Sequence, residues 1–548
     1  MTRRTLITLL LTPVLALAAH PKLAPDFADR ATSGTVPVIV RYRVQPQSRH
    51  HQMAARLGGR LKRSLEIVNS RVYEVPVSAL EALADDPDVE YISPDRPVKA
   101  MLDYAEPAVN ANIAFQSGWT GAGVTVAVID SGIMDTHPDL HNAAGQSRVV
   151  FAKDFNPTVG NDYFDRFGHG THVSGILGGN GAMSTGSGYT HTFRGIAPNV
   201  RFVNLRVLDQ NGAGTDSMVI AAIQGAISLK STYNIRIINL SLGRPVFESY
   251  AKDPLCQAVE QAWKAGIVVV VAAGNEGRNN SYATDGYGTI TAPGNDPYVI
   301  TVGAMNDVKT ITRTDDKMAS YSSKGPTLFD HVVKPDIVAP GNRIMSALPA
   351  GLALTNSYPG NQVPWTYYEA NGNAGGSTYY FTLSGTSMAT PMVSGAAALL
   401  LQKTPSLTPD QVKARLMKTA SKTFPVSTTA TDPVTGAVYT DYYDIFTIGA
   451  GYLDVWAALN NSDVATQPAL SPTVSFDSST GTVSLVNAAN VVWGTNVVWG
   501  TNVVWGTNVV WGTSTMQGFN VVWGTNVVWG TSTTTRGEAT SLSINGDN

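Results

Sequence analysis

The chain has 548 residues, 43% of them hydrophobic and only 14% charged, so it can form two or three units with a large core. A formal net charge of -3 gives no electrostatic reason to expect nucleic acid or an anionic membrane as a partner. The single cysteine, Cys256, excludes an internal disulfide.

Residues 1–19 are predicted to be a cleaved signal peptide. Arg3 and Arg4 precede a short apolar run, Leu6–Ala18, that ends in an A-x-A-like cleavage site. This run is too short to cross a bilayer comfortably, and no later segment reaches the length of a membrane span. We therefore expect a secreted protein, extracellular or periplasmic, with no membrane-spanning helix.

Residues 20–102 are typical of a small α+β unit. The pattern predicts two strands with helices after them and a final extended segment, at Val36–Arg43, His51–Leu57, Leu65–Val77, Ser78–Leu83 and Val89–Val98 in chain order. Because the order of these elements begins β-α-β, we expect a ferredoxin-like module.

Residues 103–461 alternate apolar runs with helical stretches. Five nearly continuous β-branched runs predict strands that are buried on both faces: Val124–Ile129, Phe202–Leu208, Ile235–Leu242, Ile267–Ala272 and Val299–Val302. Helices are predicted at Asp216–Ser228, Asp253–Ala265 and Ser387–Leu401. This succession indicates an α/β fold, a parallel sheet flanked by helices. The Gly/Asn/Tyr-rich stretches 178–193 and 351–382 are expected to be surface loops.

The C-terminal part differs in composition. A Ser/Thr/Pro-rich linker is predicted at 462–489, followed by the hexapeptide repeat NVVWGT at 490–531 and a tail at 532–548. An even period of six fits short strands, while expanded low-complexity sequence without a fixed fold is the alternative. A repeat that binds a surface or drives assembly, with the rest of the chain serving only to release it, is a second hypothesis for the function.

Four short segments carry residues suited to catalysis. Asp130 ends the apolar run VAVID, where catalytic groups gather in open α/β sheets. His169 opens HGTH, Ser387 lies at the start of an apolar helix, and Asn275 follows another apolar run. A serine at a helix start and an asparagine beside it can stabilise an oxyanion. Taken singly, each residue is equally explained as a turn or cap residue.

His169 and His172 are also spaced as a metal-binding pair on one helix. A zinc site needs a third ligand, and the sequence contains no HExxH motif. Asp154, Asp162 and Asp165 are the nearby carboxylates that could complete such a site. A metallohydrolase therefore stays open on the residues alone.

As a set, the motifs VAVIDSGI, GHGTHVSGI and SGTSMATPMVSG resemble the subtilisin-like serine proteases, the subtilase family (peptidase S8), over roughly residues 103–461. The resemblance implies hydrolysis of polypeptide substrates with no cofactor required for the chemistry. Ser387 would be the nucleophile, His169 the general base and Asp130 the residue that orients it. Asn275 and the Ser387 backbone N–H would bind the oxyanion, and His172 would have no chemical role.

The same resemblance assigns substrate-binding and maturation segments. Ser241-Leu242-Gly243 and Ala272-Ala273-Gly274 would pair with an extended peptide and form the walls of its P1 pocket. Thr291 stands where glycine is usual and would narrow that pocket. Residues 20–102 would be an inhibitory prodomain, an intramolecular partner that the enzyme itself removes near Ala100–Tyr104.

One segment departs from the family pattern. Where many subtilisins carry a calcium loop, this chain has Gly178–Phe193, which is nearly free of carboxylates. Asp139 matches a candidate calcium ligand and is equally explained as a surface turn residue. Structural calcium is therefore an open expectation.

Overall fold

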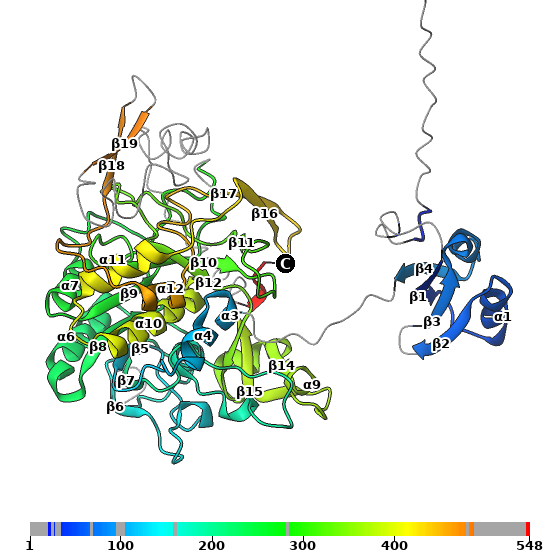
Figure 1. Ribbon diagram of the computed structural model, residues 1–548, viewed down its shortest axis with the longest axis horizontal. Helices are drawn as coiled ribbons and strands as arrows, with labels where there is room; N and C mark the ends of the chain where they lie inside the picture. Colours follow the sequence, from blue (N-terminus) through cyan, green and yellow to red (C-terminus); the bar gives the residue numbers. More distant parts are fainter. Residues whose placement is uncertain are drawn as a thin grey trace, which may run out of the picture. The chain divides into compact units, whose positions relative to one another are not determined.

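The structure is a computed structural model that describes residues 20–23, 27, 34–65, 69–94, 105–156, 162–280, 284–477, 482–486 and 544–547. The predicted signal peptide, the predicted cleavage segment up to Tyr104 and the NVVWGT repeat lie outside the described residues. The chain divides into two units, Met1–Lys99 and Ala100–Asn548 (Figure 1).

The first unit is an antiparallel sheet with two helices. Its elements are β1 (Thr35–Tyr42), α1 (Ser48–Arg56), β2 (Arg60–Leu65), β3 (Ser70–Pro76), the 3₁₀ turn η3 (Val77–Ala79), α2 (Leu80–Ala84) and β4 (Val89–Pro94). The sheet order is β2-β3-β1-β4, the order of a split β-α-β arrangement. Alternate residues of β1 are buried, so this unit has an apolar core of its own. The alternating stretch expected at Leu65–Val77 corresponds to β3, and β2 precedes it.

The second unit is built on an eight-stranded sheet. Its strands are β5 (Thr125–Asp130), β6 (Val149–Asp154), β7 (Arg201–Arg206), β8 (Ile235–Leu240), β9 (Val268–Ala272), β10 (Ile300–Asn306), β11 (Lys317–Met318) and β12 (Ile337–Pro340). The order is β11-β10-β9-β8-β5-β7-β6, with β12 also paired to β10, and only β10 and β11 pair antiparallel. Every residue of β5, β9, β10 and β12 is buried, which confirms the predicted parallel sheet.

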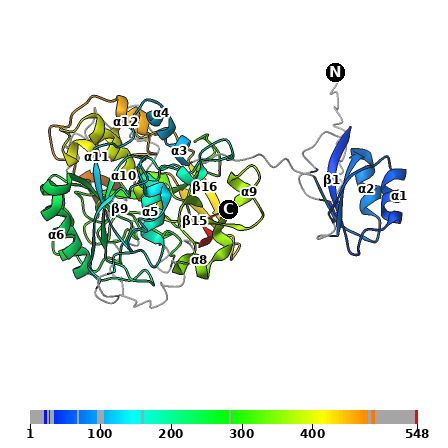
Figure 2. The same ribbon diagram turned by 90° about the horizontal axis from the view of Figure 1, so that it is seen from below.

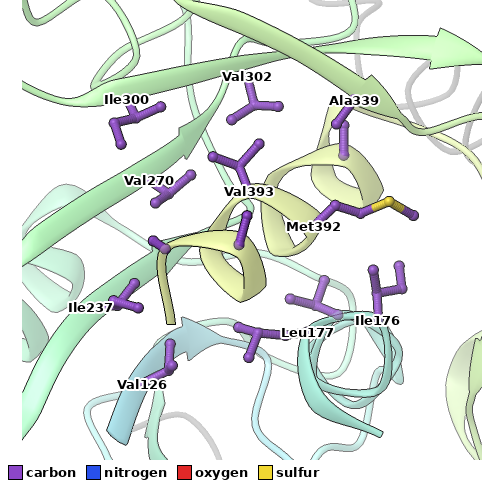
Figure 3. Close-up of a cluster of buried hydrophobic side chains, with 14 of the residues drawn as sticks. Val126, Ile176, Leu177, Ile237, Val270, Ile300, Val302, Ala339, Met392 and Val393 are labelled. Carbon is purple, nitrogen blue, oxygen red and sulfur yellow. The ribbon is translucent and has the colours of Figure 1, made fainter. Parts of the chain in front are cut away.

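Helices cover this sheet (Figure 2). They are α3 (Ala105–Ala108), α4 (Ala111–Gln116), α5 (His169–Gly178), α6 (Asp216–Tyr233), α7 (Pro254–Lys264), α10 (Thr386–Lys403), α11 (Pro409–Thr419) and α12 (Val455–Asn460). Figure 3 shows Met392 and Val393 of α10 beside Leu177 of α5, facing strand residues such as Val126 and Val270. Among the residues that the structure describes, no helix is both long and apolar enough to cross a membrane.

The two stretches expected to be surface loops are more ordered than predicted. Residues 344–383 form β13 (Ile344–Ala347), α8 (Ala353–Ser357), η7 (Pro359–Asn361), β14 (Gln362–Pro364), α9 (Trp365–Tyr368) and β15 (Gly376–Leu383), with sheet order β13-β15-β14. Phe193, Val363, Tyr368 and Tyr380 make a small core that joins this sheet to 178–193. The loop prediction was wrong for residues 351–382, because aromatic side chains supply apolar contacts that the Gly/Asn content conceals.

The segment expected to be a linker at 462–489 also packs on the second unit. It includes the hairpin of β18 (Thr473–Asp477) and β19 (Thr482–Val486), and Val332 forms a bridge with Thr473. A different hairpin of this unit is formed by β16 (Ser427–Thr431) and β17 (Val438–Tyr442). Ala469 and Val474 are buried in a cluster with Met417 and Phe446. Turns η4 (Pro138–Leu140) and η6 (Ala182–Ser184) complete the described elements of this unit.

Candidate active site

Asp130 and His169 are in direct contact. Asp130 is the last residue of β5 and is buried, and its Oδ1 lies 2.8 Å from His169 Nδ1. The same oxygen accepts a 2.7 Å bond from the Ser131 backbone N–H. Because a carboxylate only accepts hydrogen bonds, the proton lies on Nδ1, and the neutral imidazole keeps its lone pair on Nε2.

The surroundings of His169 change the pKa of its side chain. Burial alone would lower the pKa of His169, but the charge of Asp130 and its hydrogen bond, with Asp165 behind, outweigh burial and raise it. The His169 side chain is 14% exposed, so it is accessible while mostly desolvated. A histidine held in this way is suited to general base catalysis.

Asp165 holds the start of α5 in place, a role that the sequence analysis missed. Its buried carboxylate accepts bonds from Gly168 N (2.6 Å), Thr171 N (2.9 Å), Thr171 Oγ1 (2.7 Å) and Ser131 Oγ (2.9 Å). The sequence analysis considered Asp165 only as a metal ligand. No cap position in the sequence predicts this role, because Gly168 is the N-cap residue of α5 and Asp165 lies three residues before it.

His172 lies one turn after His169 and faces the core. It is fully buried, and its Nε2 contacts the carbonyl oxygens of Phe381 (3.0 Å) and Ile344 (3.2 Å). Burial lowers the pKa of His172 to about 3, so the ring is neutral and Nε2 donates to these carbonyls. Among the described residues no group of three or more His, Cys, Asp or Glu side chains is placed to hold a metal ion. This arrangement does not fit a metal pair of His169 and His172.

Ser387 is the second residue of α10 and lies next to Ser241. Its hydroxyl donates to the Ser241 carbonyl (3.1 Å), and the Ser241 hydroxyl donates to the Ser387 carbonyl (2.8 Å). Asn239 supports Ser241 through a 3.0 Å bond and accepts from Ser394 of α10 at 2.8 Å. Ser387 is half-buried between buried neighbours, so its hydroxyl is the accessible one in this turn.

Asn275 follows β9 and is fixed by the turn that carries Ser387. Its Oδ1 accepts bonds from Thr386 N (2.9 Å) and Thr386 Oγ1 (3.1 Å). A side chain added at Gly385, where φ is +147°, would lie 3.3 Å from Asn275 Nδ2. The amide NH₂ therefore lies beside the turn, with its carbonyl side already occupied.

The fold brings the predicted residues to one edge of the sheet. Asp130 ends β5, and Ser241 and Asn275 come after β8 and β9, which are its neighbours in the sheet. His169 and Ser387 lie at the starts of α5 and α10, and these two helices pack against each other. The carboxyl edge of a parallel sheet is where ligands bind in open α/β folds. In this structure the Ser387 hydroxyl is bonded to Ser241 rather than to His169.

Thr291 lies between the two segments predicted to bind substrate. Its N–H and its hydroxyl both donate to the Ala273 carbonyl, at 3.0 and 3.2 Å. A Cβ added at Gly243 would lie 2.6 Å from Thr291 Oγ1, and one at Gly274 would lie 2.7 Å from Thr291 Cγ2. The threonine side chain thus fills space that the two glycines leave open.

Asp139 is not arranged as a calcium ligand. It is buried, its Oδ1 accepts from Met183 N (2.9 Å), and its Oδ2 accepts from the Tyr380 hydroxyl (2.7 Å). Calcium takes six to eight oxygen ligands, and this position offers a single carboxylate that the protein already satisfies. The residues present here do not fit the ion, and a surface turn role for Asp139 is also excluded by its burial.

Comparison with known proteins agrees with the geometry. The model of the subtilase family matches residues 121–438, more than half of the chain. The chain is 39% identical to serine protease AprX of Bacillus subtilis over 372 residues, 66% of this chain and 76% of that protein. It is 35% identical to subtilisin E of the same species over 66% of this chain and 78% of that protein. The chain belongs to the subtilase family and is a serine-type endopeptidase that acts on polypeptides.

Proposed function

We propose that Ser387, His169 and Asp130 form the catalytic triad of this endopeptidase. The observation that carries the proposal is the 2.8 Å contact between Asp130 and His169 Nδ1, which leaves Nε2 as the base. The Ser387 hydroxyl leaves the Ser241 carbonyl, turns to His169 Nε2 and attacks the peptide carbonyl as the histidine takes its proton. Catalytic hydrogen bonds often tighten only when substrate binds, so its position on Ser241 is compatible with this role.

Asn275 Nδ2 and the Ser387 N–H bind the oxyanion of the tetrahedral intermediate. His169 then protonates the leaving amine, and a water activated by the same histidine hydrolyses the acyl-enzyme. Asp130 keeps the imidazole in the tautomer that the reaction needs and stabilises the imidazolium. All steps use the chain's own residues, so no cofactor is required.

The substrate lies extended along Ser241–Gly243, whose backbone groups pair with it as a neighbouring strand would. Ala272–Gly274, whose Ala273 carbonyl is bonded to Thr291, forms a wall of the P1 pocket. The Thr291 side chain occupies part of the space between Gly243 and Gly274. This narrowing supports a P1 pocket that prefers side chains smaller than the aromatic ones.

The first unit, with a core of its own, acts as an inhibitory prodomain. The enzyme cuts the segment between the two units itself, and export through the N-terminal signal delivers the mature protein outside the cell. The division of the chain into two units, the first with an apolar core of its own, supports this organisation.

A covalent serine reagent tests the triad. Diisopropyl fluorophosphate should abolish hydrolysis and add one phosphoryl group that peptide mapping places on Ser387. Labelling of His169→Ala should fall steeply, because the serine then lacks its base. An adduct on a different serine, or full activity after stoichiometric labelling, would overturn the assignment.

A further inference from the structure

The last residues of the chain are bound to the unit that carries Ser387. Asp547 is fully buried, although the sequence around it is polar. Figure 1 and Figure 2 show this C-terminal segment, in red, against the part of the second unit that holds β15. These residues belong to the segment 532–548, which the sequence identifies only as a tail.

The Asp547 carboxylate occupies a site built for it. Oδ1 lies 2.5 Å from Arg278 Nη2 and 2.8 Å from Ser320 Oγ, and Oδ2 accepts a 2.7 Å bond from Ser320 N. The Arg278 side chain is only 10% exposed, so the ion pair is largely desolvated. A charge-assisted contact of this kind discriminates strongly in favour of a carboxylate.

The backbone on either side is recognised as well. The Asn342 side chain accepts from Asp547 N (2.7 Å) and donates to Asp547 O (3.1 Å). Asn361 donates to Ile544 O (2.6 Å), and the Ile544 side chain joins the main apolar core. These contacts hold the backbone of the peptide at Ile544 and at Asp547.

Position 546, which lies just before Asp547, accepts only glycine. Its φ is +63°, and a Cβ there would overlap Asn342 Oδ1 and Ser384 Oγ. Only glycine fits this conformation and this space. Ser384 lies in the turn that leads into Ser387, so the site for the C-terminal peptide adjoins the active-site turn.

We propose that the protease unit contains a peptide-binding site, formed by Arg278, Ser320, Asn342 and Ser384, whose ligand is the chain's own C-terminus, Ile544–Asp547. Since Val486 ends a hairpin on the same unit, residues 487–543 with their NVVWGT repeat connect two points of one body.

Peptide binding to a truncated chain tests this site. The chain ending at Ser543, with Ser387→Ala to prevent cleavage, should bind a fluorescein-labelled peptide of residues 543–548 saturably in an anisotropy titration. The Asp547→Asn peptide should bind at least tenfold more weakly, and a peptide with Gly546 and Asp547 exchanged, which keeps composition and charge, should not bind. The three peptides are compared on one and the same receptor, so differences between their affinities do not come from changes in its fold.

The full chain provides the control. With its own tail in place, the Ser387→Ala protein should bind the same peptide at least tenfold more weakly than the truncated chain. Equal binding by both chains, equal binding of the three peptides, or no binding up to millimolar peptide would overturn the proposal. A dimer of the full chain that depends on residues 544–548 would also overturn it, because the tail would then dock on a second copy.

Discussion

His169 and His172 belong to one helix, and their different environments separate their chemistry. His169 meets the Asp130 carboxylate and solvent, whereas His172 meets two backbone carbonyls in the core. The sequence motif places both histidines on α5. Only their contacts decide between two possibilities, a general base at His169 or a metal site formed by both residues. Asp165 shows the reverse case, because its role depends on five hydrogen bonds that the sequence does not reveal.

The raised pKa of His169 predicts the acidic limit of activity. The base must be neutral, so kcat/KM should fall as pH decreases through a pKa that lies above the usual value of about 6.5. In Asp130→Asn, burial remains while the carboxylate charge is lost, so this limit should move to lower pH and kcat should fall by about 10⁴. Asp315→Asn, an exposed aspartate, is the control and should leave the profile unchanged. An unshifted limit in Asp130→Asn would contradict the assignment.

Thr291 predicts the P1 preference. Thr291→Gly should raise kcat/KM for a peptide with Phe at P1 relative to Ala by roughly 10-fold to 200-fold, the range for one or more methylene groups in a pocket. Thr291→Ser, which keeps the hydroxyl bonded to Ala273, should change this ratio less. Profiling a peptide library with the three proteins measures the effect. A wild-type enzyme without any P1 preference would show that the pocket is not formed there.

Among the elements, five strands of the main sheet were predicted (β5, β7, β8, β9 and β10), whereas β6, β11, β12 and the added sheet of residues 344–383 were not. Buried β-branched runs such as Val268–Ala272 have few alternatives to a strand. By contrast, β15 owes its order to an aromatic partner distant in sequence, because its Tyr380 packs against Phe193. The hairpin β18–β19 follows a Ser/Pro-rich stretch whose burial depends on residues far away in the chain.

A buried charge cluster joins the KPDIVAPG segment to the residues expected to be a linker. Asp336 accepts from Lys334 (2.7 Å) and Ser471 (2.5 Å), and Lys413 lies 3.3 Å away. Asp336→Asn would leave two buried ammonium groups without their counter-charge, so unfolding free energy should fall by about 3–5 kcal/mol. Ser471→Ala removes one hydrogen bond and should cost about 1 kcal/mol. Urea denaturation in the Ser387→Ala background measures both, and equal small effects would show that the cluster is not charged.

In the whole molecule, the described protease unit contains no residue of the repeat, because residues 490–531 lie outside the described part of the chain. Deleting residues 490–531 removes none of the described contacts, so hydrolysis of a small peptide should be unchanged. Deleting 462–486 removes Ala469, Ser471 and Val474 from the second unit and should lower its melting temperature. Loss of hydrolysis in the first deletion would favour the alternative in which the repeat is the working part.

In the mechanism proposed above, Ser387 performs both peptide hydrolysis and removal of the prodomain. The most direct test compares purified wild type with Ser387→Ala in a peptide hydrolysis assay, together with intact-mass analysis of both proteins. We expect the variant to lose about 10⁶ of kcat, the scale for removing the serine of such a triad, and to accumulate as the uncut precursor. Normal hydrolysis and normal processing in Ser387→Ala would contradict the account.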